Sequence, residues 1–243
     1  MPRSRRACSS YLVETAGAAI VADLGTGALA NLLSLRAADS LDAIVVSHMH
    51  ADHFLDLVPL RYALAYGTRA NERRLPVYLP GDGRDLFRRL VAAFEHEEGR
   101  DFLAEFDVRG YGPGDVLRIG AMTVRFAPVR HFIPGCAMRF ETGGASLVFS
   151  GDTAPCEPVA ALAANASVLL CEASLATGTE EEPRGHLTAR EAGELAHGAS
   201  AGRLVITHYG TEADPVVLAG DARAAGYAGP IDVADDLDRF VVG

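Results

Sequence analysis

Hydrophobic positions along the first quarter of the chain switch between strand-like and helix-like spacing. Short apolar runs at 10–14 and 18–23 predict two strands of a hairpin, and the residues 28–38 predict a helix. A buried-strand run at 42–48 then leads into a stretch rich in histidine, which a helix at 55–67 follows. The chain therefore opens with a sequence rich in β-structure.

The middle of the chain predicts further strands, and the last third alternates helices with strands. The middle elements are a strand at 75–80, a helix at 83–95, and strands near 103–109, 115–119, 121–128, 136–142 and 145–152. The last third has helices at 157–164, 188–198 and 214–225, alternating with strands at 167–173, 203–208 and 231–234. The Gly143–Gly144 pair indicates a hairpin turn, and Thr188 with Glu191 forms the spacing of a helix capping box.

This order of elements favours an α/β protein with two sheets covered by helices on both outer faces. A simple doubly wound sheet fits less well, because hairpins come early in the chain. Hydrophobic residues make up 49% and charged residues 22% of the chain, as in an ordinary globular protein with a sizeable core. Neither a linker nor an internal repeat is evident, so we expect one domain over residues 1–243.

Five short stretches with metal-binding side chains each come at the end of an expected strand. They are "VADLG" with Asp23, "VSHMHADH" with His48 to His53, "VRHFIPG" with His131, "FSGDTAP" with Asp152, and "VITHYG" with His208. In α/β proteins ligands gather beyond strand ends, because the loops converge there while the sheet stays rigid. The five stretches therefore indicate one shared site.

The stretch "HMHADH" is the most specific of these signals. In a chain of this composition, H-x-H-x-D-H would arise by chance with a probability of roughly 6 × 10⁻⁴. Neutral imidazoles two residues apart, as at His48 and His50, can bind one ion, while Asp52 and His53 turn toward a second. The stretch thus predicts half of a centre that holds two metal ions.

The isolated residues His131, Asp152 and His208 are weak signals one by one. A lone histidine is usually structural or exposed, and an aspartate in "SGDT" is usually a turn or cap residue. Together they supply the ligands from separate loops that a two-metal site requires. Asp152 is the natural bridge, because one carboxylate can span two ions about 3.5–4 Å apart.

These motifs, in this order, resemble those of the metallo-β-lactamase superfamily. "CEAS" at 171–174 and "GHLT" at 185–188 resemble the H-E-A-T and H-S-T stretches of its ribonuclease Z-like, short-form branch. The opening "SSYLVE…IVADLGTGAL" also resembles the first strands of that branch. The resemblance covers nearly the whole chain and implies the αββα four-layer sandwich, with two mixed sheets flanked by helices.

The resemblance also implies a role for each residue of the site. His48, His50 and His131 would bind one zinc ion (Zn²⁺), and Asp52, His53 and His208 the other, with Mn²⁺ or Fe²⁺ as alternative metals. Asp152 would bridge the two ions, and Asp23 would orient the histidine-rich loop through hydrogen bonds. Asp52 would orient the bridging hydroxide, and Glu172 would hold His186, the candidate general acid.

One difference from the ribonuclease Z-like branch limits the size of the substrate that we expect. The 20 residues between His131 and Asp152 (132–151) are nearly all used by one hairpin, so the long arm that grips tRNA has no room there. We therefore expect a phosphodiesterase that acts through the bridging hydroxide on a small nucleotide, a cyclic nucleotide or a short RNA end. The alternatives are an esterase or lactonase on the same centre, an iron redox protein, and a metal-binding scaffold without activity.

Charge and cysteine usage set the expected partners and compartment. A net charge of −10 argues against a large nucleic-acid partner, whereas a small, anionic substrate can bind beside two cations. The cysteines Cys8, Cys136, Cys156 and Cys171 are widely spaced, as in reduced cytoplasmic proteins. We expect neither a secretory signal nor a membrane span, and a homodimer is compatible with the sequence.

Overall fold

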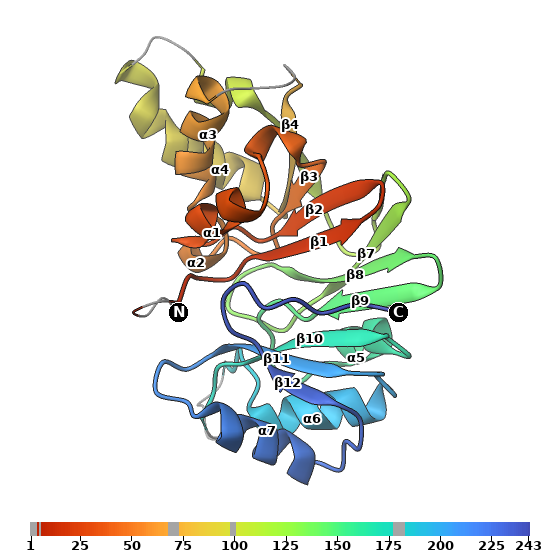
Figure 1. Ribbon diagram of the computed structural model, residues 1–243. Helices are drawn as coiled ribbons and strands as arrows, with labels where there is room; N and C mark the ends of the chain where they lie inside the picture. Colours follow the sequence, from red (N-terminus) through yellow and green to blue (C-terminus); the bar gives the residue numbers. More distant parts are fainter. Residues whose placement is uncertain (1–3, 5, 68–72, 98–100, 177–182) are drawn as a thin grey trace. The chain divides into compact units, whose positions relative to one another are not determined.

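The computed structural model describes the chain except for residues 1–3, 5, 68–72, 98–100 and 177–182 (Figure 1). The described residues form two compact units, within Pro2–Tyr111 and within Gly112–Gly243, called here the N-terminal and the C-terminal unit. Each unit is built on one mixed β-sheet with its own helices. The expectation of a single domain stays a prediction.

The sheet of the N-terminal unit has five strands in the order β1-β2-β3-β4-β5. They are β1 (Tyr11–Thr15), β2 (Ala18–Ala22), β3 (Ala43–Val45), β4 (Leu75–Pro80) and β5 (Phe106–Tyr111). β1 and β2 form the expected antiparallel hairpin, and the strands from β2 to β5 run parallel. All residues of β2 and β3 are buried, as in parallel strands that are covered on both faces.

The helices of this unit follow the expected order with small differences at their ends. They are α1 (Ala28–Leu35), η1 (Ala38–Ser40), α2 (Ala51–Phe54), α3 (Leu57–Tyr66), α4 (Gly83–Val91), η2 (Ala92–Glu97) and η3 (Phe102–Glu105). The strand expected near 103–109 is partly wrong, since its first residues form η3. The side chain of Asp101 caps this turn by accepting the Leu103 N–H at 2.9 Å, which holds the backbone in a helical conformation.

The sheet of the C-terminal unit has seven strands in the order β12-β11-β10-β9-β8-β7-β6. They are β6 (Val116–Ile119), β7 (Met122–Pro128), β8 (Cys136–Thr142), β9 (Ala145–Phe149), β10 (Val168–Ala173), β11 (Leu204–Tyr209) and β12 (Ile231–Val233). β6 to β9 are antiparallel neighbours, and β9 to β12 run parallel. The Gly143–Gly144 pair turns between β8 and β9 with positive φ at both glycines, as predicted.

This topology places several strand ends at one edge of the C-terminal sheet. β9, β10 and β11 are parallel, and β7 points the same way because both it and β9 are antiparallel to β8. The carboxyl ends of these four strands therefore meet at the same edge. His131 follows β7, Asp152 follows β9, and Glu172 and His208 lie at the ends of β10 and β11.

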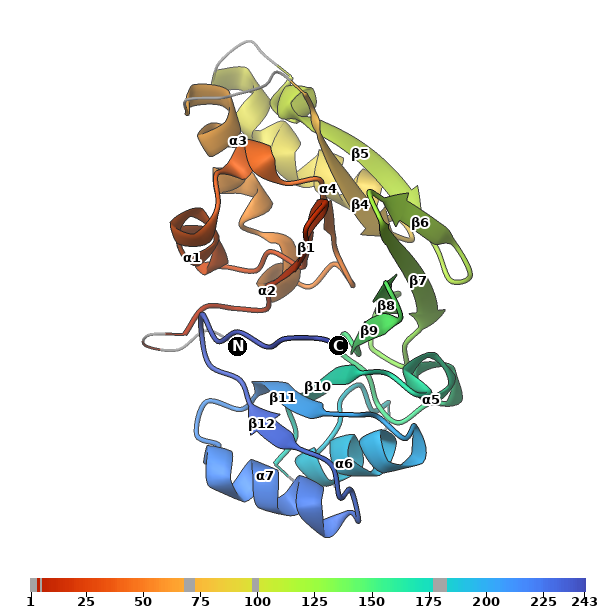
Figure 2. The ribbon, with the colours of Figure 1, turned by 45° about the vertical axis from the view of Figure 1, so that its right-hand side comes forward.

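Among its described residues, this unit has the helices α5 (Glu157–Ala163), α6 (Ala189–Gly198) and α7 (Pro215–Ala224). α6 and α7 lie side by side on the face of β10 to β12 (Figures 1 and 2). A Cβ at Gly193 would lie 2.2 Å from the Ala222 carbonyl oxygen, so the two helices approach as closely as a glycine allows. The capping box predicted at Thr188 and Glu191 is present at the start of α6.

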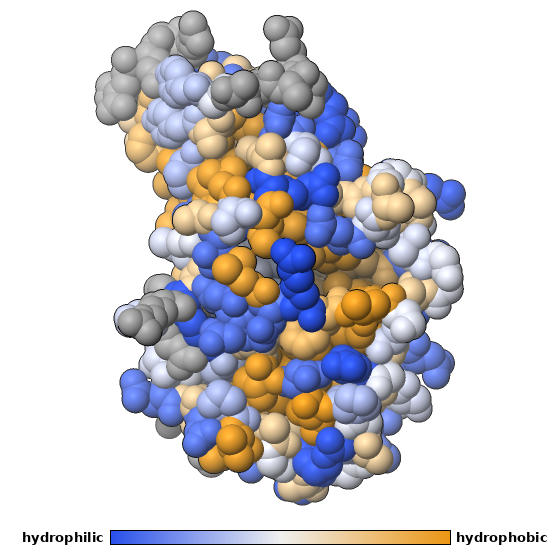
Figure 3. Space-filling model, in the orientation of Figure 1, coloured by the Kyte–Doolittle hydropathy of each residue, from blue (hydrophilic) through white to orange (hydrophobic). Residues whose placement is uncertain are grey.

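None of the helices in the described part of the chain combines the length and the apolar character needed to cross a lipid bilayer. The face seen in Figure 3 carries hydrophobic side chains scattered among hydrophilic ones. Such scattering is ordinary, because a folded chain has too few polar residues to cover its surface.

Candidate metal centre

The first cluster of candidate ligands, in the N-terminal unit, follows β3 directly. It consists of His48, His50, Asp52 and His53. The sequence predicted a loop here, whereas the structure forms one helical turn, α2, with His50 at its N-cap. His48 and His53 are fully buried, while His50 and Asp52 are partly exposed. Asp52 and His53 lie in the turn, and His48 and His50 lie just before it, so four candidate ligands fall within six residues.

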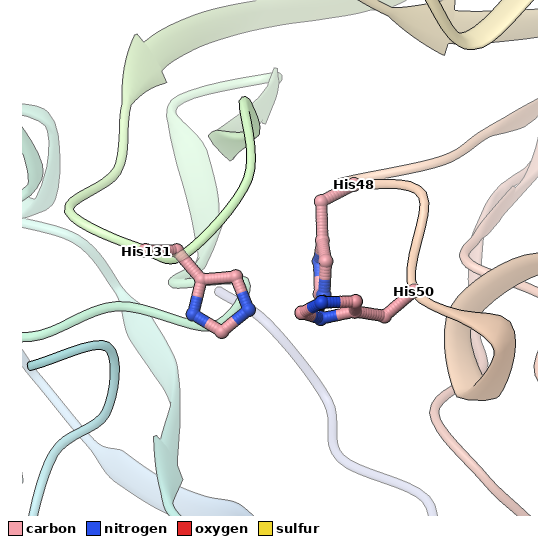
Figure 4. A group of neighbouring side chains, drawn as sticks. All are labelled: His48, His50 and His131. Carbon is pink, nitrogen blue, oxygen red and sulfur yellow. Dashed lines mark hydrogen bonds between the residues drawn. The ribbon is translucent and has the colours of Figure 1, made fainter. Parts of the chain in front are cut away.

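His48 and His50 converge as two ligands of one ion would. Figure 4 shows both rings extending from the turn after β3, and His131 on the loop after β7. The Nε2 atom of His48 lies 3.0 Å from Nδ1 of His50, with the ring planes at 84°. Two nitrogens bound at about 2.0–2.1 Å to a tetrahedral ion lie about 3.3 Å apart. The pair therefore suits a divalent metal ion such as zinc.

Asp23 forms hydrogen bonds to the segment that carries the first cluster. Its carboxylate accepts hydrogen bonds from the Ser47 N–H at 2.6 Å, the Ser47 hydroxyl at 2.9 Å and the Ser9 hydroxyl at 3.1 Å. It also lies 2.7 Å from Nδ1 of His53, with both side chains fully buried. Asp23 can reach the turn because β2 and β3 are parallel neighbours, so their carboxyl ends lie together.

The second cluster, in the C-terminal unit, collects side chains from the shared edge of its sheet. It consists of His131, Asp152, Glu172, His186 and His208. Ligand atoms of His131, Asp152 and His186 all lie within 4.8 Å of one another, and so do those of Glu172, His186 and His208. Asp152 and Glu172 are buried, and the three histidines are partly exposed. Buried carboxylates beside imidazoles are a donor set that fits divalent cations.

Hydrogen bonds show which ring nitrogen carries the proton in two histidines of this cluster. Nδ1 of His131 lies 2.8 Å from the Gly185 carbonyl oxygen, which can only accept, so Nδ1 carries the proton. Nδ1 of His208 lies 2.8 Å from the Ser174 hydroxyl, which itself donates to the His208 carbonyl oxygen at 2.8 Å. In both rings the lone pair is therefore on Nε2, the nitrogen that a metal ion would bind.

His208 occupies an irregular position in β11. In the parallel ladder Glu172 pairs with Thr207 and Ala173 pairs with Tyr209, so His208 is left between the two pairs as a bulge. Its φ of 44° is in the left-handed region, which non-glycine residues seldom adopt. β-bulges often re-aim a side chain next to an active site. The sequence predicted His208 at a strand end but not this conformation.

Glu172 contacts the ring of His186. Nδ1 of His186 lies 3.0 Å from Oε1 of Glu172 and 3.9 Å from Oδ2 of Asp152. The same Oε1 accepts the Thr153 N–H at 2.7 Å, and Oε2 accepts the Ser174 N–H at 3.1 Å. Burial raises the pKa of Glu172, and the hydrogen bond from His186 opposes that rise. The arrangement fixes the His186 ring through a carboxylate that is itself held by the backbone.

Sequence reasoning assigned no role to three residues that take part in these clusters. Ser47 bonds Asp23 and lies 3.1 Å from Nδ1 of His48, Ser174 bonds His208, and Gly185 accepts from His131. Each is adjacent in sequence to a motif residue or two residues from one. That proximity was the available signal, but serine and glycine are too common at strand ends to stand out.

The family model described as "Beta-lactamase superfamily domain" matches residues 19–209, more than three quarters of the chain. The chain belongs to the metallo-β-lactamase superfamily. A ribonuclease Z of a Mycobacterium species is 32% identical to it, over 100% of this chain and 92% of that protein. The probable metallo-hydrolase YhfI of Bacillus subtilis is 29% identical, over 85% of this chain and 82% of its own.

Solved structures agree with this assignment. The crystal structure of B. subtilis YhfI covers 100% of this chain and 94% of its own, with a TM-score of 0.86 at 25% identity. Human tRNase Z, short form, covers 100% and 94% with a TM-score of 0.76, and at 20% identity it shows the fold alone. The metallo-β-lactamase fold and the resemblance to ribonuclease Z are thus confirmed. This chain is a metal-dependent hydrolase of the superfamily, and its fold implies binding of divalent metal.

Proposed function

We propose that this metallo-β-lactamase-fold chain is a dinuclear phosphodiesterase that acts on a small nucleotide, a cyclic nucleotide or a short RNA end. The observation that carries the proposal is the pair of His186 and Glu172 in the second cluster, 3.0 Å apart. A phosphodiester has a poor leaving group, and a histidine held beside the metal ligands is suited to protonate it.

In this proposal the two clusters supply ligands to the same pair of ions. His48 and His50 with His131 would hold one ion, and Asp52 and His53 with His208 the other, with Asp152 shared. The ring nitrogens support this division, because His53, His131 and His208 each use Nδ1 for a hydrogen bond within the protein. That use directs Nε2 toward a metal. We take zinc as the metal, because imidazole and carboxylate ligands suit it.

Divalent ions bound there would lower the pKa of a water molecule and neutralise negative charge on the phosphoryl oxygens. The protein's own groups would do the remaining work. Asp52, a ligand candidate 28% exposed in its side chain, would orient the attacking water and accept its proton. His186 would donate a proton to the leaving oxygen, and Glu172 would keep the ring in place. Glu172 can do so because its two oxygens also accept the backbone N–H groups of Thr153 and Ser174, which fix the carboxylate.

The chain between His131 and Asp152 supports a small substrate. It consists of a short loop, β8, the Gly143–Gly144 turn and β9, so that region offers little surface for a large RNA. The ribonuclease Z relatives support the phosphodiester bond as the target. All four cysteines are free thiols, which supports a reducing compartment such as the cytoplasm. Whether the chain forms a homodimer is a separate prediction.

The test compares hydrolysis of bis-p-nitrophenyl phosphate with that of p-nitrophenyl acetate by protein loaded with zinc or with manganese. We expect cleavage of the diester by the wild type, at least a 1,000-fold loss in His48→Ala, and a smaller loss in His186→Ala. His197→Ala, on the far end of α6, is the matched control and should keep full activity.

Two results would contradict the proposal. Turnover of the acetate alone would favour the esterase or lactonase alternative. Absence of both activities from protein that retains iron would favour the redox alternative.

A further inference from the structure

Phe132 is a large apolar side chain that remains 48% exposed although it follows the candidate ligand His131 directly. Its ring centroid lies 5.0 Å from that of His131 and 5.8 Å from that of His186, the second contact being edge-to-face at 65°. An exposed aromatic ring thus contacts both a metal-ligand candidate and the candidate general acid. The proposed reaction gives this ring no role.

The backbone of Gly185 supports the ring from one side. A Cβ atom at this position would lie 2.5 Å from Cε2 and 2.7 Å from Cζ of Phe132, closer than real contacts allow. A side chain at this position would displace the ring, so the glycine lets the ring rest against this segment. Since one side packs on the backbone, the exposed half of the side chain is the part that a ligand could cover.

The position of the ring is coupled to that of the metal ligand. The carbonyl oxygen of Gly185 accepts the Nδ1–H of His131 at 2.8 Å, so the same peptide supports Phe132 and orients His131. Nδ1 of His186, one residue on, is held by Glu172. The ring is therefore set in place before any substrate binds, which lowers the entropic cost of binding.

We propose that Phe132 is a stacking platform for the nucleobase on the leaving-group side of the substrate. This inference rests on the proposed function, because His186 marks the leaving-group side. Bases stack on aromatic side chains without regard to sequence, since every base has a π-face. The class of substrate is then a phosphodiester whose leaving group carries a base, such as a nucleotide diester or an RNA end.

The experiment measures binding, so that it does not depend on turnover. Isothermal titration of the zinc-loaded protein compares AMP with ribose 5-phosphate, which share the sugar and phosphate and differ in the base. We expect AMP to bind the wild type about 10-fold more tightly than ribose 5-phosphate. Phe132→Ala should remove this difference, and Phe132→Tyr should restore it. Val116→Ala, an exposed apolar residue of β6, is the control and should leave the ratio unchanged.

A second variant gives an independent signal. The chain has no tryptophan, so Phe132→Trp would place a single fluorophore at the platform. AMP should quench its emission by stacking, and ribose 5-phosphate should not.

Equal affinity of the wild type for the two ligands would overturn the inference, as would an equal loss for both in Phe132→Ala. Retained preference for AMP in a protein that cleaves no diester would instead remove the proposed function and leave the platform in place.

Discussion

The two clusters of candidate ligands contain similar side chains, histidines and carboxylates, but the chain brings them together in different ways. The first cluster comes from one short segment after β3, the residues 48–53, which end in the helical turn α2. The second cluster draws five side chains from residues 131 to 208, at the ends of different strands or before α6. The first depends on local chain geometry, and the second depends on a correctly formed sheet.

The hydrogen bonds around the two clusters differ in the same way. A single buried carboxylate, Asp23, serves both buried histidines of the first cluster, His53 directly and His48 through Ser47. In the second cluster each histidine has a separate acceptor: a backbone carbonyl for His131, Ser174 for His208, and Glu172 for His186. One substitution should therefore damage the first cluster broadly, whereas damage to the second should stay confined to one ligand.

The largest expected effect is that of Asp23→Ala. It leaves Ser47 and His53 with buried donors that have lost their acceptor, which should lower the free energy of unfolding by roughly 3–5 kcal/mol. Urea denaturation of the metal-free protein measures this loss. Asp23→Asn is the milder comparison, because asparagine tolerates the positive φ of 58° and keeps one acceptor oxygen. A variant Asp23→Ala as stable as the wild type would show that the first cluster does not depend on this carboxylate.

Ser174→Ala should have a smaller and more local effect. The substitution removes the hydroxyl that fixes Nδ1 of His208, so zinc affinity should fall about 10- to 100-fold while the fold is retained. Competition with a chromogenic chelator measures the affinity. Ser34→Ala is a matched control, because that exposed serine of α1 donates to the Asn31 carbonyl oxygen of its own helix at 2.6 Å. Loss of both bound ions in Ser174→Ala would argue against separate support of each ligand.

The smallest effect should come from Glu191, whose capping box starts α6 just after His186. Burial acts to raise its pKa, but the Arg184 guanidinium and the N–H and hydroxyl of Thr188 together hold the pKa below the ordinary 4.5. A lowered pKa in the folded state stabilises the protein at pH values above the unfolded pKa, and the contribution disappears as the pH falls through the folded one.

Glu191→Gln should therefore lower the free energy of unfolding by about 1 kcal/mol at pH 7. Its difference from the wild type should shrink as the pH falls below about 4. Thermal unfolding at several pH values measures this. Glu194→Gln is the control, because the ion pair of Glu194 with Arg190 is largely exposed and should contribute little. An effect of Glu191→Gln that does not change with pH would contradict the assignment.

The order of elements and the residues of both clusters could be predicted from the sequence, because strand ends carried the motifs. Hydrophobic spacing located β2, the glycine pair located the Gly143–Gly144 turn, and the Thr188–Glu191 spacing located the capping box of α6. It did not locate the helical turn α2, since four residues are too few for a helical period. The strand expected near 103–109 failed at its start because the Asp101 side chain stabilises η3, a local effect that periodicity does not report.

Interactions that depend on the backbone were also out of reach. Gly185 contributes a backbone carbonyl oxygen and the space for Phe132. Neither contribution depends on a side chain, so a motif search does not reveal it. The supporting role of Ser174 depends on the bulge in β11, which only the register of the ladder reveals. Sequence thus indicated which residues form the clusters, and the tertiary structure supplied how each one is held.

The bulge at His208 has a consequence for the length of β11. Because Tyr209 pairs with Ala173 across the bulge, β11 accommodates the extra residue His208 without changing the face on which Tyr209 lies. The Tyr209 hydroxyl therefore still donates to the Ala234 carbonyl oxygen at 3.1 Å and connects β11 to the C-terminal segment. The one-residue insertion thus adds a polar side chain at the edge of the sheet, while the residues of β11 on either side of it keep their pairing with β10.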